Sequence, residues 1–411
     1  MHSVRLIVLL LLGLLPAFSA AGQESSTGQE KPNPLLELLA AVPDTAEVWD
    51  STPITSYADY RVLEAARGIS APTKADFDNR TDTARLWLAA SGGLSAGFPM
   101  EYLMQYLEGM EEAVGFGWFD VNRALTFGQP PSMGSVLAGD FDAERIAAAF
   151  EARGFTGSAA DDVTVWCGPA GCDEGMLMNL RSRNPANPFG GALGREEPLA
   201  VLPGLVLNSA DYGVLTAMIG ARQGEIPSLA DNPLFQAAAR ALAARGTLRQ
   251  AVFVSVASIG FGYTMPDPDG EQPTFEGFGT LPPYLLMVVA DVVTEDQEKT
   301  YVGLVYGDRE TAQAASEELV ARFQVAQSAR AQQPFLTLVE ERGGTVGAPT
   351  IHDDLDAGAA VALLEIYKPL PSNELQPDGV YAPSALLFRL LMQSIYARDL
   401  SLVGVDINAA P

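Results

Sequence analysis

One serine and one histidine could together form a hydrolytic site. The segment Gly93-Leu94-Ser95-Ala96-Gly97 matches the G-x-S-x-G pattern, in which a sharp turn exposes the serine hydroxyl as a nucleophile. His352 follows downstream and could act as its base. The nucleophile turn needs a strand before the serine, whereas the flanking residues favour a helix, a break and a second helix. A secreted serine hydrolase using Ser95 and His352 is therefore the alternative interpretation of function, and not the leading one.

His352 also lies beside carboxylates that could bind a metal ion or orient a general base. The run His352-Asp353-Asp354-Leu355-Asp356 places three acidic side chains near the imidazole. A polar loop before the apolar segment 360–367 explains the same residues without a ligand. The other histidine belongs to the expected signal peptide, and no group of thiolates is present, so a structural zinc site is not expected. We therefore expect His352→Ala to leave function intact.

A second acidic segment partly matches the loop that binds calcium in EF-hand proteins. In residues 265–276, the side chains of Asp267, Asp269 and Glu276 fall at loop positions 3, 5 and 12. Position 1 is Met265, which offers no carboxylate, and no pair of helices flanks the segment. An acidic surface turn is the preferred interpretation, and weak calcium binding is the alternative.

The two cysteines are expected to form a disulfide bond. Cys167 and Cys172 enclose the turn Gly168-Pro169-Ala170-Gly171, which can bring their Cα atoms within bridging distance. A zinc or redox site is the alternative, but two thiolates do not complete a tetrahedral site, and the four-residue spacing differs from the C-x-x-C of redox motifs. The bridge would fix a local turn after the expected strand 163–166.

The charge balance excludes several classes of function. The 411 residues include 25 Lys and Arg but 51 Asp and Glu, which gives a formal net charge of −26. This excess of acid argues against nucleic-acid binding, because phosphates need basic side chains, and against docking to an anionic bilayer. The chain contains no phosphate-binding loop, dinucleotide fingerprint or H-E-x-x-H motif, so no cofactor is expected. The expected partner is an unidentified small molecule or protein.

The first residues have the features of a secretory signal peptide. Residues 1–21 combine a short basic start, the apolar run 6–15 and small residues before an expected cleavage site after Ala21. An uncleaved N-terminal anchor is the alternative. The polar segment 22–34 would form a flexible linker, and no later segment is long and apolar enough to predict a membrane span. We therefore expect a secreted or extracytoplasmic protein, and the preference for Arg over Lys is typical of a GC-rich bacterial genome.

The pattern of apolar residues predicts an α+β fold. Its first part is predicted to be mostly helical, with one helix that a capping pattern at Ser56 would begin and Gly68 would end. Strands and helices then alternate in two β/α units, which an acidic Pro/Gly-rich connector joins. The helical region, the first unit, the connector and the second unit are expected at residues 35–127, 128–260, 261–283 and 284–411.

The two β/α units are predicted to be an internal duplication. Residues 135–155 and 301–323 each have the pattern of a strand, a Gly-Asp turn and an Ala/Glu-rich helix. Residues 234–256 and 387–405 form a second matching pair in the same order. Duplication requires the helices of the first pair to occupy equivalent positions beside equivalent strands. The alternative is that two α+β segments resemble each other by composition alone.

A resemblance to other proteins covers residues 115–255 best. This part contains GFGWFDVNRALTFGQPPSMGSVLAGDFDAERIAAAFEARGF, then VTVW and SLADNPLFQAA. It resembles a group of uncharacterised exported bacterial proteins that share a Gly-Asp-Phe-Asp, helix and strand layout. That group has no assigned function, so the resemblance implies a secreted bacterial α+β protein and no catalytic or binding residue.

The leading interpretation of function is a secreted, non-enzymatic binding or interaction protein. A single histidine outside the signal peptide and the lack of a complete catalytic constellation favour it over an enzyme. A duplicated fold also builds a cleft or a symmetric interface between its repeats. The residues do not indicate which ligand or partner such a surface would bind.

Overall fold

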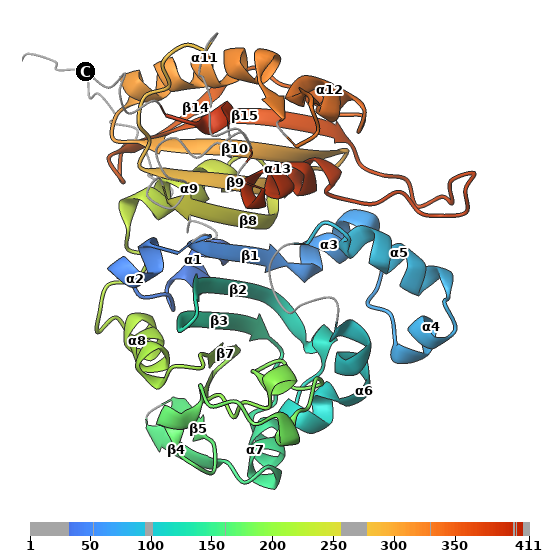
Figure 1. The fold of residues 1–411 in the computed structure, drawn as a ribbon, viewed down its shortest axis with the longest axis vertical. Coiled ribbons are helices and arrows are strands. Elements are labelled where there is room, and N and C mark those ends of the chain that lie inside the picture. The colour runs from blue at the N-terminus through green and yellow to red at the C-terminus, as the bar shows by residue number, and fades with distance from the viewer. Residues whose placement is uncertain are drawn as a thin grey trace, which may run out of the picture. The chain divides into compact units, whose positions relative to one another are not determined.

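A continuous β-sheet, in which every strand pairing is antiparallel, forms the centre of the fold (Figure 1). It is seen in a computed structural model that describes residues 33–51, 53–94, 102–160, 162–255, 278–328, 330–397, 399 and 401–405. Helices cover both faces of the sheet. The predicted α+β class is therefore confirmed.

Strands from the first half of the chain form one side of the sheet, in the order β1, β2, β3, β7, β6, β5 and β4. β1 is the innermost of these strands, and β4 is the edge. In chain order they are β1 (Thr55–Asp59), β2 (Val121–Gln129), β3 (Ser132–Gly139), β4 (Thr156–Ala160), β5 (Val163–Cys167), β6 (Leu199–Leu202) and β7 (Leu205–Asn208).

Strands from the second half continue the sheet from β1, in the order β8, β9, β10 and β15, with β13 and β14 both paired to β15. The two halves join where Tyr57 of β1 lies opposite Ala251 of β8. These strands are β8 (Thr247–Ser255), β9 (Leu286–Val293), β10 (Gln297–Tyr306), β13 (Thr345–Val346), β14 (Thr350–Asp354) and β15 (Ala359–Pro369); β11 (Gln327–Ser328) and β12 (Gln333–Pro334) form a separate pair.

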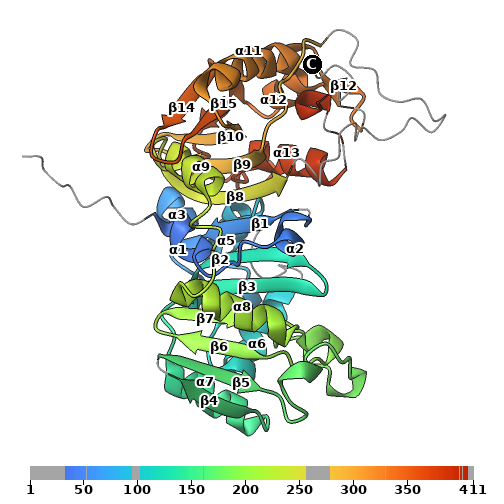
Figure 2. The ribbon, with the colours of Figure 1, turned by 90° about the vertical axis from the view of Figure 1, so that its left-hand side faces the viewer.

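One face of the sheet carries a single hydrophobic core that extends across both halves. Along β8, Phe253 belongs to this core, whereas its neighbours Val252 and Val254 face the opposite side. Figure 2 shows α8 and α9 in front of the sheet on this face. The helices that complete this core are α1 (Pro34–Leu39), α2 (Ala46–Trp49), α8 (Tyr212–Gln223) and α9 (Pro233–Ala243).

The opposite face carries two separate cores, one in each half. The first lies under α3 (Tyr60–Arg67), α4 (Lys74–Asp78), α5 (Asp82–Ser91), α6 (Leu103–Val114) and α7 (Ala143–Ala152). The second lies under α11 (Arg309–Val325), α12 (Phe335–Glu340) and α13 (Leu386–Tyr396). Because strands such as β8 and β9 are buried on both faces, their apolar residues form nearly continuous runs.

The start of α3 differs from the prediction. Ser56 does not begin a helix, because residues Thr55–Asp59 form β1, which pairs with β2 and β8 and is buried throughout. The helix begins directly after β1, at Tyr60. Its first turn is capped by Asp59, whose Oδ1 accepts a hydrogen bond from the Val62 amide at 3.1 Å. It ends as predicted at Gly68, which has a positive φ of 57°.

The predicted helical region 35–127 therefore also contains two strands of the sheet. β1 lies wholly within it, and β2 begins within it at Val121. The strands of the predicted units 128–260 and 284–411 belong to the same sheet, since β8 pairs with both β1 and β9. Most of the expected connector 261–283 lies outside the described residues.

Both halves contain the same succession of paired elements. β1, β2 and β3 pair in turn, as do β8, β9 and β10. α7 follows β3 and α11 follows β10, and the first turns of these helices are capped by Asp142 and Asp308. A later strand, β7 or β15, then returns to pair with β3 or β10.

None of the helices in the described ranges is both long and apolar enough to cross a membrane. The expected signal peptide, residues 1–21, and the linker 22–34 up to Pro32 lie outside those ranges.

Candidate functional site

His352 lies on β14, a short strand that pairs with β15, and not in the polar loop that was expected. Its acidic neighbours are engaged elsewhere: Asp353 forms an ion pair with Arg309 at 3.4 Å, and Asp354 with Arg240 at 3.1 Å. Across the described ranges, no three His, Cys, Asp or Glu side chains gather closely enough to hold a metal ion. The carboxylates beside His352 thus hold β14 to α9 and α11.

Ser95 lies outside the described residues, as do Asp267, Asp269 and Glu276 of the candidate calcium loop. Gly93, near the start of the serine motif, is described, and its carbonyl accepts a hydrogen bond from Gln250 Nε2 at 3.0 Å. Gln250 is on β8, and three strands, β9, β10 and β15, separate β8 from β14. Gly93 therefore lies beside β8, whereas His352 lies on β14, beyond the three intervening strands.

Replacing His352 with glutamine is expected to make folding stability less dependent on pH between about 7 and 5. Burial lowers the pKa of His352, and the nearby Asp354 only partly opposes this effect. Below the ordinary histidine pKa of about 6.5, His352 therefore binds a proton more readily in the unfolded chain than in the folded one. The folding stability consequently decreases as the pH decreases. Urea unfolding at the two pH values would measure the change. Equal pH dependence in both proteins would contradict this assignment.

The predicted disulfide bond between Cys167 and Cys172 is present, with the two Cα atoms 4.6 Å apart. The turn between them is closed by the Gly171 amide, which donates to the Gly168 carbonyl at 2.9 Å. The bridge fixes the start of an irregular segment between β5 and β6, which projects from the sheet (Figure 2).

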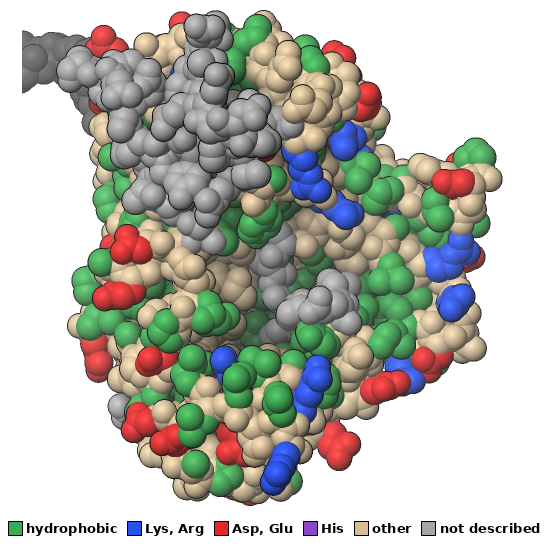
Figure 3. All heavy atoms as spheres, viewed as in Figure 1, with side chains coloured by type: hydrophobic (Ala, Val, Ile, Leu, Met, Phe, Trp, Pro, Cys, Tyr) green, Lys and Arg blue, Asp and Glu red, His purple; other side chains and the backbone are tan. Residues whose placement is uncertain are grey.

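This segment carries an exposed apolar loop, residues 175–184, which we call the apolar loop. Leu177, Met178 and Leu180 leave 61%, 63% and 68% of their surface exposed. Arg181 and Arg183 follow directly, are exposed, and form no ion pair with any residue of the described ranges. Figure 3 shows hydrophobic, basic and acidic side chains interspersed over the lower part of the molecule. An apolar cluster of this kind commonly marks an interaction site.

Polar groups of the apolar loop form hydrogen bonds with one another. Asn179 accepts from the Arg181 amide at 3.2 Å and donates to Ser182 Oγ at 2.8 Å. At its base, a Cβ on Gly175 would lie 2.6 Å from the Ala210 carbonyl oxygen, so only glycine fits this close approach. The exposed apolar side chains thus sit on a pre-organised backbone.

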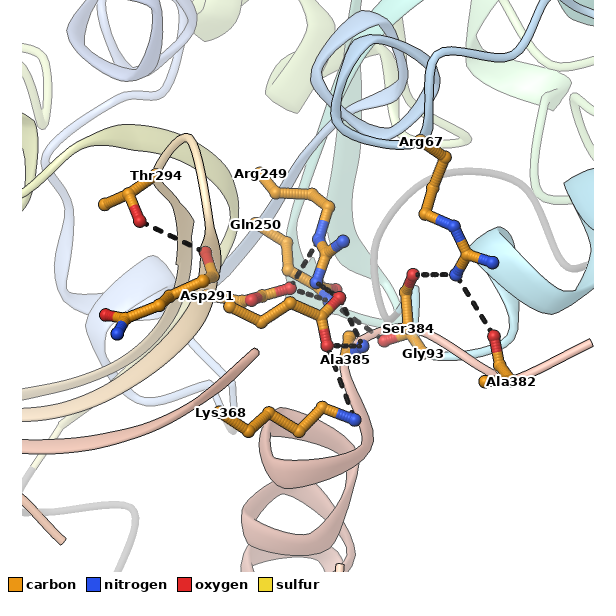
Figure 4. A network of polar contacts seen from close by, with 12 residues as sticks. Arg67, Gly93, Arg249, Gln250, Asp291, Thr294, Lys368, Ala382, Ser384 and Ala385 are labelled. Carbon is orange, nitrogen blue, oxygen red and sulfur yellow. Dashed lines mark hydrogen bonds and ion pairs between the residues drawn. The ribbon is translucent and has the colours of Figure 1, made fainter. Parts of the chain in front are cut away.

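A buried charged cluster lies at the middle of the sheet (Figure 4). Arg249 of β8 donates from Nε to Asp291 of β9 at 2.7 Å and from Nη2 to Glu298 of β10 at 2.8 Å. Gln250 Nε2 donates to the same Asp291 oxygen at 3.1 Å, and Lys368 Nζ lies 3.6 Å from Glu298. We call Arg249, Asp291, Glu298 and Lys368 the charged cluster.

Burial and mutual attraction compete in the charged cluster. Burial raises the pKa of Asp291, although Arg249 opposes this. Burial lowers the pKa of Arg249, but Asp291 and Glu298 together raise it above its ordinary value. Arg249 Nη1 and Asp291 Oδ1 have no hydrogen-bond partner among the described residues. Each charged side chain of the cluster is paired with an opposite charge inside it, so its arrangement is that of a buried ion-pair network.

The charged cluster also anchors a long segment between β15 and α13, residues 370–385, which we call the C-terminal arm. The Ala385 amide at the start of α13 donates to both oxygens of Glu298, at 3.1 and 3.2 Å. A Cβ on Gly93 would lie 2.6 Å from Ala385 Cβ, so the close approach of these two segments requires glycine at position 93.

Arg67 of α3 fastens the C-terminal arm to the helices of the first half. Its guanidinium, on a residue only 3% exposed, donates to Asn373, Ser372, Ala382 and Ser384 at distances of 2.9 to 3.2 Å. Figure 4 shows the bonds to Ala382 and Ser384. All four acceptors are neutral, so the arm is bound by hydrogen bonds alone at this point. Farther out the arm ends in an exposed hairpin, which Figure 1 shows as the loop projecting from the second half.

A small cavity of about 20 Å³ opens under α13. Its walls are mostly apolar side chains of β9, β10 and α13, and its polar members Ser394 and Asp399 already bond to Leu390 O and to Ser328 Oγ. It therefore has the character of a packing defect in the core.

The charged cluster and the apolar loop were not predicted from the sequence. Arg249 precedes the apolar run of β8, and Asp291 interrupts the apolar run of β9. A charged residue within or beside an apolar strand was therefore the sequence feature that could have indicated the cluster. For the apolar loop, the signal was the sequence Met176-Leu177-Met178 in a Gly- and Asn-rich stretch without strand or helix periodicity.

Comparison with known proteins assigns no family. No family model matches the chain, and no curated protein matches it. Among solved structures the chain is similar to crystal form I of TP0453, with a TM-score of 0.32 and 10% identity, over 87% of this chain and 98% of that one. Crystal form III of TP0453 gives a TM-score of 0.31 and 10% identity, over 81% and 94%. Similarity at this level carries no functional inference.

Proposed function

We propose that this protein is an extracytoplasmic, non-enzymatic interaction protein that docks a protein partner through the apolar loop. The observation that carries the proposal is the exposure of Leu177, Met178 and Leu180 on a backbone fixed by hydrogen bonds and a disulfide. Binding energy at interfaces is concentrated in a few large side chains, and a pre-organised loop loses little entropy when it binds.

Location outside the cytoplasm is part of this proposal. The Cys167–Cys172 disulfide supports it, because such bonds persist in oxidising compartments. Residues 1–21 have the pattern of a signal peptide. A bacterial cell envelope would satisfy both observations.

We also propose that the sheet arose by internal duplication of a β–β–β–α unit followed by a returning strand. The matching successions β1–β2–β3–α7–β7 and β8–β9–β10–α11–β15 support it, with β8 at the start of the second copy and not in the first as predicted. The predicted pairing of 234–256 with 387–405 does not match, because α9 is followed by the strand β8 but α13 is followed by a short 3-10 turn at Ser401–Val403. The antiparallel pairing of β1 with β8 is the arrangement expected at a two-fold axis between repeats. The helical insertion α3–α6 and the segment carrying the apolar loop would be additions to the first copy.

Photo-crosslinking in the native host tests the docking role of the apolar loop. A photoreactive phenylalanine analogue at position 178 is expected to yield a discrete crosslinked protein, and Leu177→Ser combined with Leu180→Ser should suppress it. The matched control is position 355, where Leu355 is 85% exposed on the turn before β15 but lies outside the loop. Equal crosslinking from both positions, or none from either, would contradict the proposal.

A further inference from the structure

We propose that the partner of the apolar loop is a second copy of this chain, which docks the hairpin end of its C-terminal arm onto the loop. This inference rests on the proposed docking role of the loop and identifies its occupant. The hairpin end, residues 374–380, is exposed at every position. Within it, Leu375 and Val380 are 47% and 52% exposed. It therefore offers a second apolar surface that is partly exposed.

The charges of the two surfaces are complementary. The apolar loop follows the exposed Asp173 and Glu174 and carries Arg181 and Arg183 directly after its exposed leucine. The hairpin end, residues 374–380, carries Glu374 and Asp378 and no basic residue. Figure 3 shows acidic and hydrophobic side chains together on the projecting arm. Contact between loop and hairpin would thus cover apolar side chains on both and pair two cations with two carboxylates.

Contact between two copies of the same surface is less favourable. Loop against loop would bring four arginines together, and hairpin against hairpin would bring four carboxylates together. Within one chain, the hairpin is held along α5, where Arg85 donates to the Gly379 carbonyl and lies 5.7 Å from the Tyr381 ring. A hairpin from another copy is therefore the better occupant of the loop.

The hairpin is fixed for such a role. The Gln376 amide donates to the Val380 carbonyl at 2.9 Å, and the Gly379 amide to the Gln376 carbonyl at 2.8 Å. Arg67 holds the base of the arm. Because both surfaces are small and their ion pairs exposed, the association should be weak, with a dissociation constant of about 1 μM or above.

Charge reversal tests the contact by sedimentation equilibrium at concentrations up to about 200 μM. Arg181→Glu with Arg183→Glu should weaken self-association at least about tenfold, and so should Glu374→Arg with Asp378→Arg. Mixing the two variants should produce a heterodimer, because each loop then meets a hairpin of opposite charge. All four residues are exposed, so unchanged circular dichroism and melting are expected of every variant.

Three outcomes would overturn the inference. The first is a monomer at every concentration, and the second is association that charge reversal or mixing does not affect. The third is crosslinking from position 178 exclusively to lipid or to a different protein. If that product is a different protein, the proposed docking role stands and the inference about the second copy fails.

Discussion

Replacing Arg249 with methionine is expected to lower the free energy of unfolding by about 3–5 kcal/mol at neutral pH. Arg249 is 1% exposed, and it is the cation nearest to both Asp291 and Glu298, which are 0% and 2% exposed. Its loss leaves Asp291 with Gln250 as its remaining donor, while Glu298 keeps Lys368 and the Ala385 amide. A buried carboxylate without a cation carries most of this cost.

The effect of this substitution should shrink as the pH falls. Burial already raises the pKa of Asp291, and removing Arg249 removes the main opposing influence. A carboxyl group whose folded pKa lies above its unfolded value of about 3.9 binds a proton more readily in the folded state. Stability is therefore lost as pH rises through this window, so urea unfolding should show a smaller difference from the wild type at pH 5 than at pH 7.5.

Two further variants separate charge from packing. Combining Arg249→Met with Asp291→Leu should recover part of the loss, because replacing buried ions with apolar groups of similar size is often neutral. Arg61→Met removes a single ion pair, which Arg61 forms with Asp140 at 2.8 Å; the two side chains are 62% and 83% exposed. This variant should change the free energy of unfolding by less than about 1 kcal/mol. If both single arginine variants lost the same stability, burial of the charged cluster would not be the cause.

Local features of the fold were predictable from the sequence because short-range interactions determine them. Gly68 ends α3 as predicted, because it directly follows the apolar periodic segment of that helix. The disulfide joins two cysteines only five positions apart, so the intervening turn alone brings them together. Each of these contacts is made within a few residues.

β1 could not be predicted in the same way. Its residues Thr55–Asp59 have a helix-start pattern, yet they form a strand because β2 and β8 pair with both of its edges. The partner residues are about 70 and 195 positions away, so no local pattern reports them. The continuous sheet depends on this one short strand, and two separate units are the natural prediction without it.

The candidate functional residues also divide into those that a local sequence pattern suggests and those that only the folded structure reveals. Composition and motif spacing directed attention to Ser95 and His352. A short sequence pattern of this kind can match a catalytic motif without forming a catalytic site. The apolar loop is functionally interesting because Leu177, Met178 and Leu180 remain exposed after folding, and exposure is a property of the packed structure. The sequence shows that these three residues are apolar. It does not show that they stay uncovered in the described part of the fold.

Replacing Arg67 with methionine is expected to release the C-terminal arm. Arg67 supplies hydrogen bonds to four acceptors of the arm, and the Asn373 side chain donates back to the Arg67 carbonyl at 2.6 Å. Hydrogen bonds to a charged group contribute about 1.5–3 kcal/mol each, and the freed acceptors can regain water once the arm lifts away. The loss should therefore appear as local opening more than as global unfolding.

Hydrogen exchange followed by mass spectrometry measures this opening. The amides of Ser384 and Ala385, which donate to the Ala89 carbonyl and to Glu298, should exchange at least about 30-fold faster, corresponding to about 2 kcal/mol. Arg85→Met is the matched control, because Arg85 contacts the exposed end of the arm and not its base. The control should leave the exchange of these two amides nearly unchanged.

The alternative role for Arg67 is packing within the first half, and it predicts a different result. In that case the variant would speed exchange in α3 and lower the midpoint of global unfolding, while the amides at the base of the arm would keep their protection. Arg67→Lys distinguishes the two roles further, because lysine retains the charge but cannot reach four acceptors with one rigid fork. If arm protection depends on the guanidinium geometry, lysine should restore little of it, and self-association through the hairpin should weaken in parallel.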